Sequence, residues 1–270
     1  VSYSSINPSG VAVEVQATLT APTAVRAAGT RSPAVVLLHA GWGWEAPVPA
    51  VTAQYAKALS EEGFYVLEPK LFRNSAAAPV NPPSLLPMVY DALKYLATRE
   101  EIDSKRIGVS GFSTGGALSL HSAASWAQAK YSKDPNLKFS AHAPFYPVCW
   151  AFADFARGKR SNPIVPVGAF TKWTGAQVKI FVGGRDNYED QDPNSCAEFV
   201  GALPPDAQKG FSVQLYAEAT HGWDQPSTKF MEKNACKGRG CENTNESNPA
   251  ITQRGISDMV DFFKASLAAE

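Results

Sequence analysis

Continuous apolar runs alternate with segments of helical periodicity along most of this 270-residue chain. The run PAVVLLHA at residues 33–40 has no polar face, which is typical of a strand covered on both sides. The run VKIFV at residues 178–182 has the same character. Because helices that follow such strands return the chain across the sheet, the alternation predicts an α/β fold with a mostly parallel central sheet and helices on both faces.

The same alternation extends over residues 1–270, which we expect to form a single domain. Strands are predicted at residues 11–19 (an edge strand), 33–40, 64–69, 107–111, 139–146, 178–182 and 211–217. Helices are predicted at 50–62, 85–98, 114–129, 195–203 and 256–268, with a turn at 103–106. Residues 150–176 are expected to form a loop or small cap. Residues 224–250 are expected to be a polar inserted surface loop, prone to disulfide formation.

Composition argues against several kinds of partner. Lys plus Arg number 25 and Asp plus Glu number 25, so no charge excess favours nucleic acid or an anionic membrane. No apolar run approaches the length that spans a bilayer, and no His cluster suggests zinc. We expect no cofactor, no metal, no nucleic-acid or membrane partner, and a monomer or small homo-oligomer.

The stretch GVSGFSTGG contains G-x-S-x-G between an expected strand and an expected helix. In that setting Gly111 and Gly115 allow a sharp turn that lifts the Ser113 hydroxyl above the sheet edge. The N–H of Thr114 would then face a developing oxyanion at the helix N-terminus. Ser113 is therefore the candidate nucleophile, with a helix N-cap as its alternative role. Ser110 falls inside the strand and is expected to be structural.

A serine hydroxyl needs a base to act as a nucleophile, and the chain has four histidines. His221 follows the last expected strand and can reach across to Ser113, so it is the candidate base. His121 lies two turns into the helix after the serine and is expected to point away from the reaction centre. His142 is expected to be structural or a polar group near the site, and His39 to fix its loop.

A catalytic base also needs a carboxylate that orients it. Asp186 comes directly after the strand VKIFV in the sequence GGRD and is the candidate. Asp190 and Asp192 are expected to be solvated loop or helix-cap residues. The resulting order of Ser113, Asp186 and His221 is the order found in α/β-hydrolases.

The loop after residues 33–40 is expected to supply a second oxyanion donor. The N–H of Gly41 is the first choice, and that of Trp42 is the second. Trp42 and Trp44 are candidates for the walls of the substrate pocket, with ordinary packing as the alternative.

Cysteine usage bears on the compartment. Cys236 and Cys241 lie in CKGRGC, which could close a small disulfide ring. This pair, the even number of cysteines and a first residue other than Met favour a secreted or periplasmic protein whose signal peptide has been removed. Free thiols in the cytoplasm are the alternative.

Six segments of the chain together resemble the dienelactone hydrolase family of α/β-hydrolases, in particular exported relatives with serine at the elbow. They are LLHAGWG, EPKLFR, SKRIGVSGFSTGG, FYPVC, GGRD and YAEATHGWD. The resemblance covers roughly residues 33–224 and the closing helix.

This resemblance implies an α/β-hydrolase fold with a catalytic triad and two oxyanion donors: Ser113, Asp186, His221, Gly41 and Thr114. It implies that Arg73 contacts a substrate carboxylate, with a surface or loop-bracing arginine as the alternative. It also implies that Cys149 and Cys196 form a disulfide pair.

Two departures from the family pattern narrow the expected substrate. Ser113 stands where dienelactone hydrolases proper carry cysteine, and no arginine follows closely after His221. We therefore expect a serine hydrolase that cleaves small carboxylic esters through an acyl-enzyme, rather than dienelactone itself. A peptidase or amidase on the same fold and a non-catalytic small-molecule binder are the alternatives.

Overall fold

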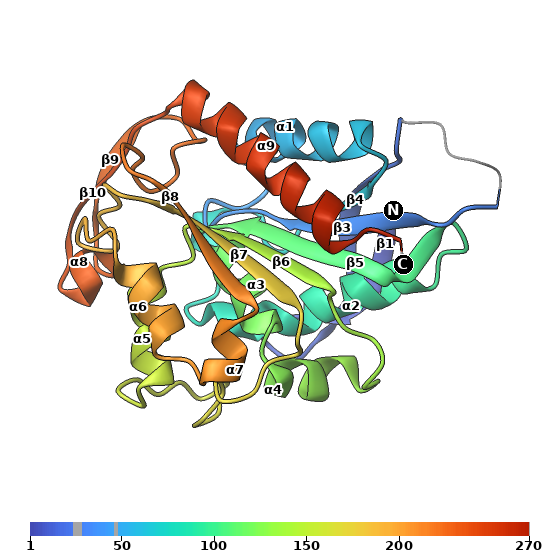
Figure 1. Ribbon diagram of the computed structural model, residues 1–270, viewed down its shortest axis with the longest axis horizontal. Coiled ribbons are helices and arrows are strands. Elements are labelled where there is room, and N and C mark those ends of the chain that lie inside the picture. The colour runs from blue at the N-terminus through green and yellow to red at the C-terminus, as the bar shows by residue number, and fades with distance from the viewer. Residues whose placement is uncertain (24–28, 46–47, 270) are drawn as a thin grey trace.

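The computed structural model describes residues 1–23, 29–45 and 48–269. An eight-stranded sheet with the order β1-β2-β4-β3-β5-β6-β7-β8 forms its centre (Figure 1). Its strands are β1 (Ser2–Ile6), β2 (Ala12–Thr20), β3 (Ser32–Leu38), β4 (Tyr65–Pro69), β5 (Ile102–Phe112), β6 (Ala141–Phe145), β7 (Gln177–Gly183) and β8 (Phe211–Tyr216). β1 and β4 each pair antiparallel with β2, and every other neighbouring pair is parallel. The predicted mostly parallel sheet is confirmed.

Helices cover both faces of this sheet. Figure 1 shows α1 (Val48–Glu61) and α9 (Pro249–Ser266) on one face. The other side carries α2 (Leu86–Ala97), α3 (Thr114–Ser122), α4 (Ser125–Ala127), α5 (Cys149–Ala156), α6 (Ser195–Gly201) and α7 (Pro205–Gln208). The α/β layering predicted from the sequence is therefore the observed one.

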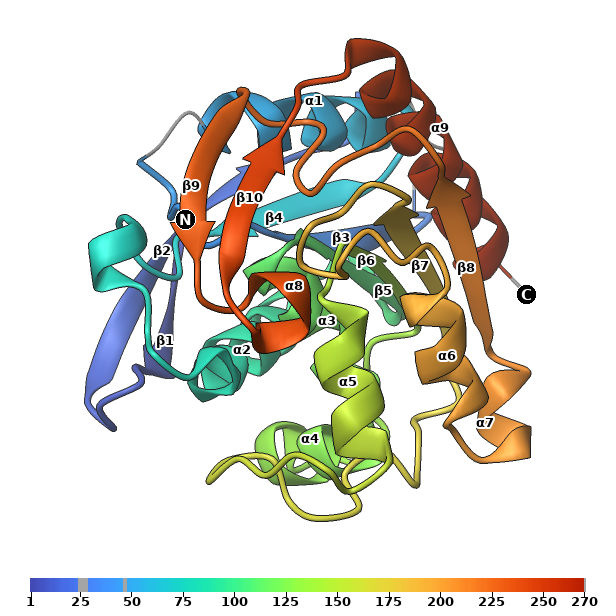
Figure 2. The same ribbon diagram turned by 90° about the vertical axis from the view of Figure 1, so that its left-hand side faces the viewer.

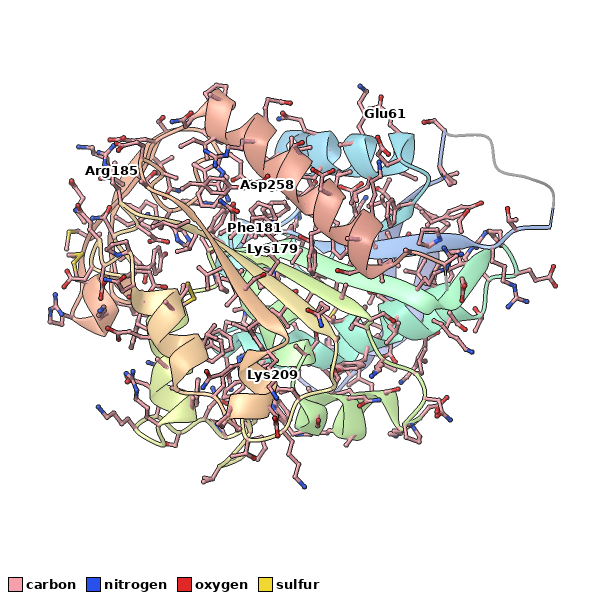
Figure 3. The ribbon with its side chains drawn as sticks, viewed as in Figure 1. Glu61, Lys179, Phe181, Arg185, Lys209 and Asp258 are labelled. Atoms are coloured by element: carbon pink, nitrogen blue, oxygen red, sulfur yellow. A yellow bond between two sulfur atoms is a disulfide. The ribbon has the colours of Figure 1, made fainter. Side chains whose placement is uncertain are left out.

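Apolar burial explains why the central strands take these positions. All seven residues of β3 are buried, as expected for a strand between two helical layers. On the α9 side, Phe181 stacks on Phe145 with ring centroids 4.4 Å apart, and Met259 and Phe263 of α9 belong to the same core. Figure 3 labels Phe181 at the sheet and Asp258 on α9.

The sheet edge differs from the prediction. The strand predicted at 11–19 is present as β2, but β1 lies outside it and forms the edge. The inward-facing residues of β1 include Tyr3 and Ser5, whose hydroxyls donate to the Met88 carbonyl and the Asp91 carboxylate. Because these inward positions are polar or amphipathic, β1 lacks the apolar alternation that identifies a strand.

The helix predicted at 114–129 is broken, which is a second correction. α3 ends at Ser122, because the backbone at residues 123–125 pairs with the segment 172–174. A short α4 and a π-helical turn, Gln128–Ser132, follow. The turn predicted at 103–106 is instead part of β5, which begins at Ile102 and shifts register against β3.

The stretches 150–176 and 224–250, which were expected to be loops or a small cap, both contain regular structure. α5 occupies the start of 150–176. Within 224–250, β9 (Thr228–Glu232) and β10 (Cys241–Asn245) form an antiparallel hairpin that carries α8 (Ala235–Gly238), and α9 already begins at Pro249. Figure 2 shows this hairpin in front of the sheet, beside α5 and α6. The expected surface loop is thus a folded element.

Two disulfides link these outer elements. Cys149 at the start of α5 is bonded to Cys196 in α6, and Cys236 is bonded to Cys241 across the hairpin end. Both expected pairings are therefore present. Among the helices of the described ranges, none combines the length and apolar character needed to cross a membrane.

Candidate active site

Ser113 occupies a strained turn between β5 and α3. Its φ of 51° and ψ of −109° lie in a region that non-glycine residues rarely adopt. The Ser113 amide donates to the Phe145 carbonyl, and its own carbonyl accepts from Ala117 in α3. Such strain is typical of a nucleophile elbow, where it exposes the hydroxyl instead of satisfying a helix cap.

The glycines around this turn are required by close backbone packing. A Cβ at Gly116 would lie 2.4 Å from the Phe145 carbonyl oxygen. A Cβ at Gly115 would lie 2.5 Å from the Leu38 carbonyl oxygen, which is also too close. The elbow therefore packs directly against the ends of the neighbouring strands, and this packing brings their loops within reach of Ser113.

The three residues that the sequence singles out form a continuous hydrogen-bonded chain. Ser113 Oγ lies 2.9 Å from His221 Nε2. His221 Nδ1 lies 2.8 Å from Asp186 Oδ2. Asp186 is fully buried, and its other carboxylate oxygen accepts from the Tyr188 amide at 2.8 Å. The Asp186 carboxylate thus favours the His221 tautomer with the proton on Nδ1, so that Nε2 is free to accept the serine proton.

Two aromatic rings hold the His221 imidazole from its sides. The Tyr188 ring centroid lies 4.2 Å from that of His221, and the Tyr146 centroid lies 4.8 Å from it. The Tyr146 hydroxyl in turn donates to Asp224 at 2.6 Å, and Tyr55 donates to the other Asp224 oxygen at 2.9 Å. These tyrosines are not evident from the sequence, because no local motif marks their contact with the histidine.

Two further buried acids, Asp224 and Glu189, lie near the His221–Asp186 pair. Burial raises the pKa of Asp224 above its ordinary value, and the pKa of Tyr146 is also raised by burial and by that carboxylate. Burial and the nearby Asp186 raise the pKa of Glu189 to about 8. Glu189 accepts from the backbone amides of Cys149 and Trp150, so it fixes the start of α5 next to the Asp186 loop.

Glu189 also belongs to the one cluster of potential metal ligands in the described part of the chain. Its other members are Cys149 and Cys196, whose sulfur atoms are bonded to each other. The disulfide leaves no thiolate there for a metal ion.

A cavity of about 650 Å³ opens beside Ser113. Its walls come from the loop after β3, the segment 78–83, one face of α3, α5, residues 160 and 162, and the β9–β10 hairpin. Ser113, His221 and Tyr188 all line it. The volume is in the range of small-molecule sites.

The candidate oxyanion residues lie together at this cavity. Gly41, Trp42 and Thr114 all line it. Gly41 is close to the helix start, since a Cβ there would lie 3.0 Å from Thr114 Oγ1. Trp42 packs edge-on against Phe230 of β9, with centroids 5.4 Å apart, so it forms a wall as expected.

Arg73 and Trp44 do not reach the cavity, and these two expectations need correction. Arg73 Nε pairs with Glu45 Oε2 at 2.5 Å, and 71% of its side chain is exposed. Trp44 lies beneath the Lys70 ammonium, 4.3 Å from its ring centroid. Neither residue is among those lining the cavity. Arg73 therefore braces its loop, which was the alternative role, and Trp44 has the packing role.

The remaining histidines are all buried. His142 Nδ1 lies 2.9 Å from the Ser119 carbonyl oxygen, so the structural role fits it. His121 was expected to point away from the reaction centre, but it lines the same cavity as Ser113, so that prediction is wrong. The four-residue spacing of Ala117 and His121 on α3, which begins directly after Ser113, contains the signal that identifies this shared face.

His39 fixes the loop that carries Gly41. Its Nε2 accepts from the Leu71 amide at 3.2 Å, and its Nδ1 lies 2.9 Å from the Ala40 carbonyl oxygen. The contact with Leu71 requires the neutral ring, because a protonated Nε2 could not accept, whereas Nδ1 can donate to the Ala40 carbonyl in either state. Burial accordingly lowers the pKa of His39 to about 4.

This arrangement predicts a pH effect on stability. The pKa of His39 is lowered on folding, so its contribution is present above about pH 6.5 and is lost as the pH falls toward 4. Between pH 7 and pH 5, the unfolding free energy of the wild type is expected to fall by about 2 kcal/mol more than that of His39→Asn. Asparagine keeps one donor and one acceptor but does not titrate in this range. Urea titrations at both pH values measure this difference. Equal losses in the two proteins would contradict it.

The hairpin is fastened to the loop that carries Asp186. Lys237 pairs with Asp192 at 2.7 Å, and Arg239 pairs with Asp190 at 2.6 Å. The two aspartates expected to be solvated or capping therefore also anchor α8. Arg185, labelled at the outer end of the fold in Figure 3, pairs with Glu246 just after β10 at 3.0 Å. These contacts hold the cavity wall against the acid loop.

Comparisons with known proteins agree with this architecture. No curated protein sequence matches the chain. The propionate-bound structure of an esterase from Thermogutta terrifontis has a TM-score of 0.66 and 16% identity, and the match covers 96% of this chain and 92% of that one. The apo form of Thermogutta terrifontis esterase 2 has a TM-score of 0.64 and 18% identity with the same coverage. At these identities the likeness establishes the α/β-hydrolase fold.

Family membership rests on the sequence match. Residues 15–267 match the family described as "Dienelactone hydrolase family". The match spans the elbow, the acid loop, the histidine loop and the hairpin. This chain therefore belongs to the dienelactone hydrolase family.

Proposed function

We propose that this protein is a serine hydrolase that cleaves small carboxylic esters through an acyl-enzyme intermediate. The observation that carries the proposal is the Ser113–His221–Asp186 hydrogen-bonded chain, with distances of 2.9 Å and 2.8 Å, at the wall of the cavity. A protein that only bound a ligand would have no need of a strained serine aimed at a buried histidine.

In the acylation half of the proposed reaction, Ser113 Oγ attacks the ester carbonyl and His221 Nε2 takes the serine proton. Asp186 holds the imidazole and stabilises its cation. The backbone N–H groups of Thr114 and Gly41 bind the oxyanion, and the partial positive charge at the start of α3 strengthens that binding. His221 then returns the proton to the departing alcohol as the tetrahedral intermediate collapses.

Deacylation repeats these steps with water as the nucleophile. His221 accepts a proton from water, and the hydroxide attacks the acyl carbon bound to Ser113. The same two N–H groups stabilise the second tetrahedral intermediate. Its collapse releases the carboxylic acid and returns the proton to Ser113.

A matched ester and amide separate an esterase from a peptidase. We expect hydrolysis of nitrophenyl butyrate with saturable kinetics, and hydrolysis of the nitroanilide of the same acid slower by orders of magnitude. The amide nitrogen is a poorer leaving group than nitrophenolate, so acylation by the nitroanilide should be slower. Comparable rates on the two would contradict the ester assignment.

The same preparation should react with an organophosphate. A similar solved structure is Thermogutta terrifontis esterase 2 phosphorylated by paraoxon. We expect paraoxon to add one diethylphosphoryl group to this chain, at Ser113, and to abolish ester hydrolysis in proportion. Intact-mass and peptide-mass measurements locate the adduct. Absence of both the adduct and turnover would support a non-catalytic binder instead.

We also propose that the protein works in an oxidising compartment, either secreted or periplasmic. The support is the pairing of all four cysteines in two disulfides. Protein isolated from its native compartment, denatured without reductant, is expected to contain no titratable thiol and to show four after reduction. Four free thiols before reduction would point to the cytoplasm.

A further inference from the structure

The cavity extends from Ser113 along one face of α3 to His121. Ser113 directly precedes α3, and Ala117 and His121 lie four residues apart on that helix, so the latter two side chains follow one side of it. All three residues line the cavity. At 1.5 Å of rise per residue, the first and last are separated by about 12 Å along the helix. The small Ala117 side chain leaves open space between them.

His121 forms the far end of this space within an aromatic enclosure. Its ring centroid lies 4.7 Å from that of Phe152 and 5.6 Å from that of Phe170. Only 4% of the residue is exposed, and burial lowers the pKa of His121 to about 3. The imidazole is therefore neutral at physiological pH, with one nitrogen able to donate and the other able to accept.

His121 has no internal use for this hydrogen-bonding capacity. Within the described ranges its Nδ1 is buried and has no hydrogen-bond partner. Buried polar atoms are nearly always paired, since an unpaired one costs free energy. His142 is also buried and its Nε2 likewise has no partner, but its Nδ1 bonds to the Ser119 carbonyl and the residue does not line the cavity. The Nδ1 of His121 itself has almost no exposed surface, so a group that enters the cavity bonds the other ring nitrogen, Nε2.

We propose that this end of the cavity is a subsite for an uncharged hydroxyl or carbonyl group carried on an aromatic arm of the ester. The inference rests on the proposed function, which places the ester carbonyl at Ser113. A phenylpropanoid-sized arm spans the space along Ala117, and the rings of Phe152 and Phe155 pack on its apolar body. A neutral imidazole then bonds the terminal polar group.

The main competing anchor is Arg160 at the cavity wall. Its guanidinium lies 5.0 Å from the Trp150 ring centroid and 5.7 Å from that of Phe155. It would favour a carboxylate. Arg160 is exposed, however, so water weakens its attraction, whereas His121 is enclosed and uncharged. A carboxylate at the enclosed end would lose its hydration without gaining a cation there.

Three methyl esters test the subsite: those of para-hydroxyphenylpropanoic, phenylpropanoic and para-carboxyphenylpropanoic acid. Wild-type kcat/KM is expected to favour the hydroxyl ester over the unsubstituted ester about three- to tenfold, the effect of one hydrogen bond. His121→Phe keeps the ring and should reduce this ratio to about one. His121→Gln keeps a donor and an acceptor and should retain part of it. His142→Gln is the matched control and should leave the ratio unchanged.

Several outcomes would overturn the proposed subsite at His121. A wild-type ratio near one overturns it, whatever the variants do, as does a ratio that survives in His121→Phe. Preference for the carboxyl ester assigns the anchor to Arg160 and also overturns it. So does failure to cleave all three esters by a protein that still hydrolyses nitrophenyl butyrate. Loss of every esterase activity and of paraoxon labelling would instead refute the proposed function.

Discussion

Replacing Ser113 with alanine is expected to lower kcat/KM for nitrophenyl butyrate by about 10⁴-fold or more. Without Oγ no acyl-enzyme can form, and His221 Nε2 loses the partner that lies 2.9 Å away. Alanine keeps the Cβ, so the strained φ of 51° is neither relieved nor worsened and the melting temperature should change little. Stopped-flow or steady-state assays measure the first effect, and calorimetry measures the second.

Ser110 provides the matched control for this experiment. It lies three residues earlier in the same stretch, is fully buried and donates to the Ala143 carbonyl oxygen at 2.7 Å. Ser110→Ala should cost about 1 kcal/mol of unfolding free energy through the lost hydrogen bond, while kcat/KM stays close to wild type. If Ser110→Ala were the variant that lost turnover, the assignment of the nucleophile would be wrong.

The elbow could be predicted from the sequence because its determinants are local. An apolar strand, a G-x-S-x-G turn and a helix follow each other within about twenty residues, and each step has its own signal. Asp186 and His221 could be predicted for a related reason. Each directly follows a strand, and parallel strands bring their carboxyl ends to one edge of the sheet. Order along the chain was then enough to place three distant residues together.

The cavity walls could not be predicted in the same way, because tertiary pairing decides them. Arg73 is held by Glu45, a partner that no periodic pattern reveals. The hairpin at Thr228–Glu232 and Cys241–Asn245 is mostly polar and partly exposed, so it lacks the apolar alternation of a strand. A disulfide and ion pairs to the acid loop stabilise it instead.

His121 shows a different limit of sequence reasoning. Its place on the same helical face as Ala117 follows from spacing alone, but a face lines a cavity only if neighbouring elements leave space beside it. Here that space depends on α5 and on residues 160 and 162, which come from the stretch without a regular sequence pattern. Helix periodicity predicts the side of the helix on which a side chain lies, whereas the presence of a cavity beside it depends on long-range packing.

Replacing Asp186 with asparagine is expected to lower kcat by about 10³- to 10⁴-fold with little change in the fold. The reason lies in which oxygen each partner uses. Oδ1 accepts from the Tyr188 amide at 2.8 Å, and Oδ2 lies 2.8 Å from His221 Nδ1. The single oxygen of asparagine must stay at the Tyr188 amide, so its NH₂ group faces Nδ1. The imidazole then carries its proton on Nε2, so Nε2 can no longer accept the proton of Ser113.

Asp192→Asn is the matched control, since Asp192 lies on the same loop but pairs with Lys237 and not with the histidine. It should weaken the anchoring of the hairpin and leave kcat within a few-fold of wild type. Combining Ser113→Ala with Asp186→Asn should cost no more than Ser113→Ala alone, because the carboxylate acts only through the histidine and serine. Additive losses would mean that Asp186 acts independently of Ser113. Near-normal kcat in Asp186→Asn would mean that another buried acid orients His221. Asp224, bonded to the Tyr146 that packs on that ring, would be the first residue to examine.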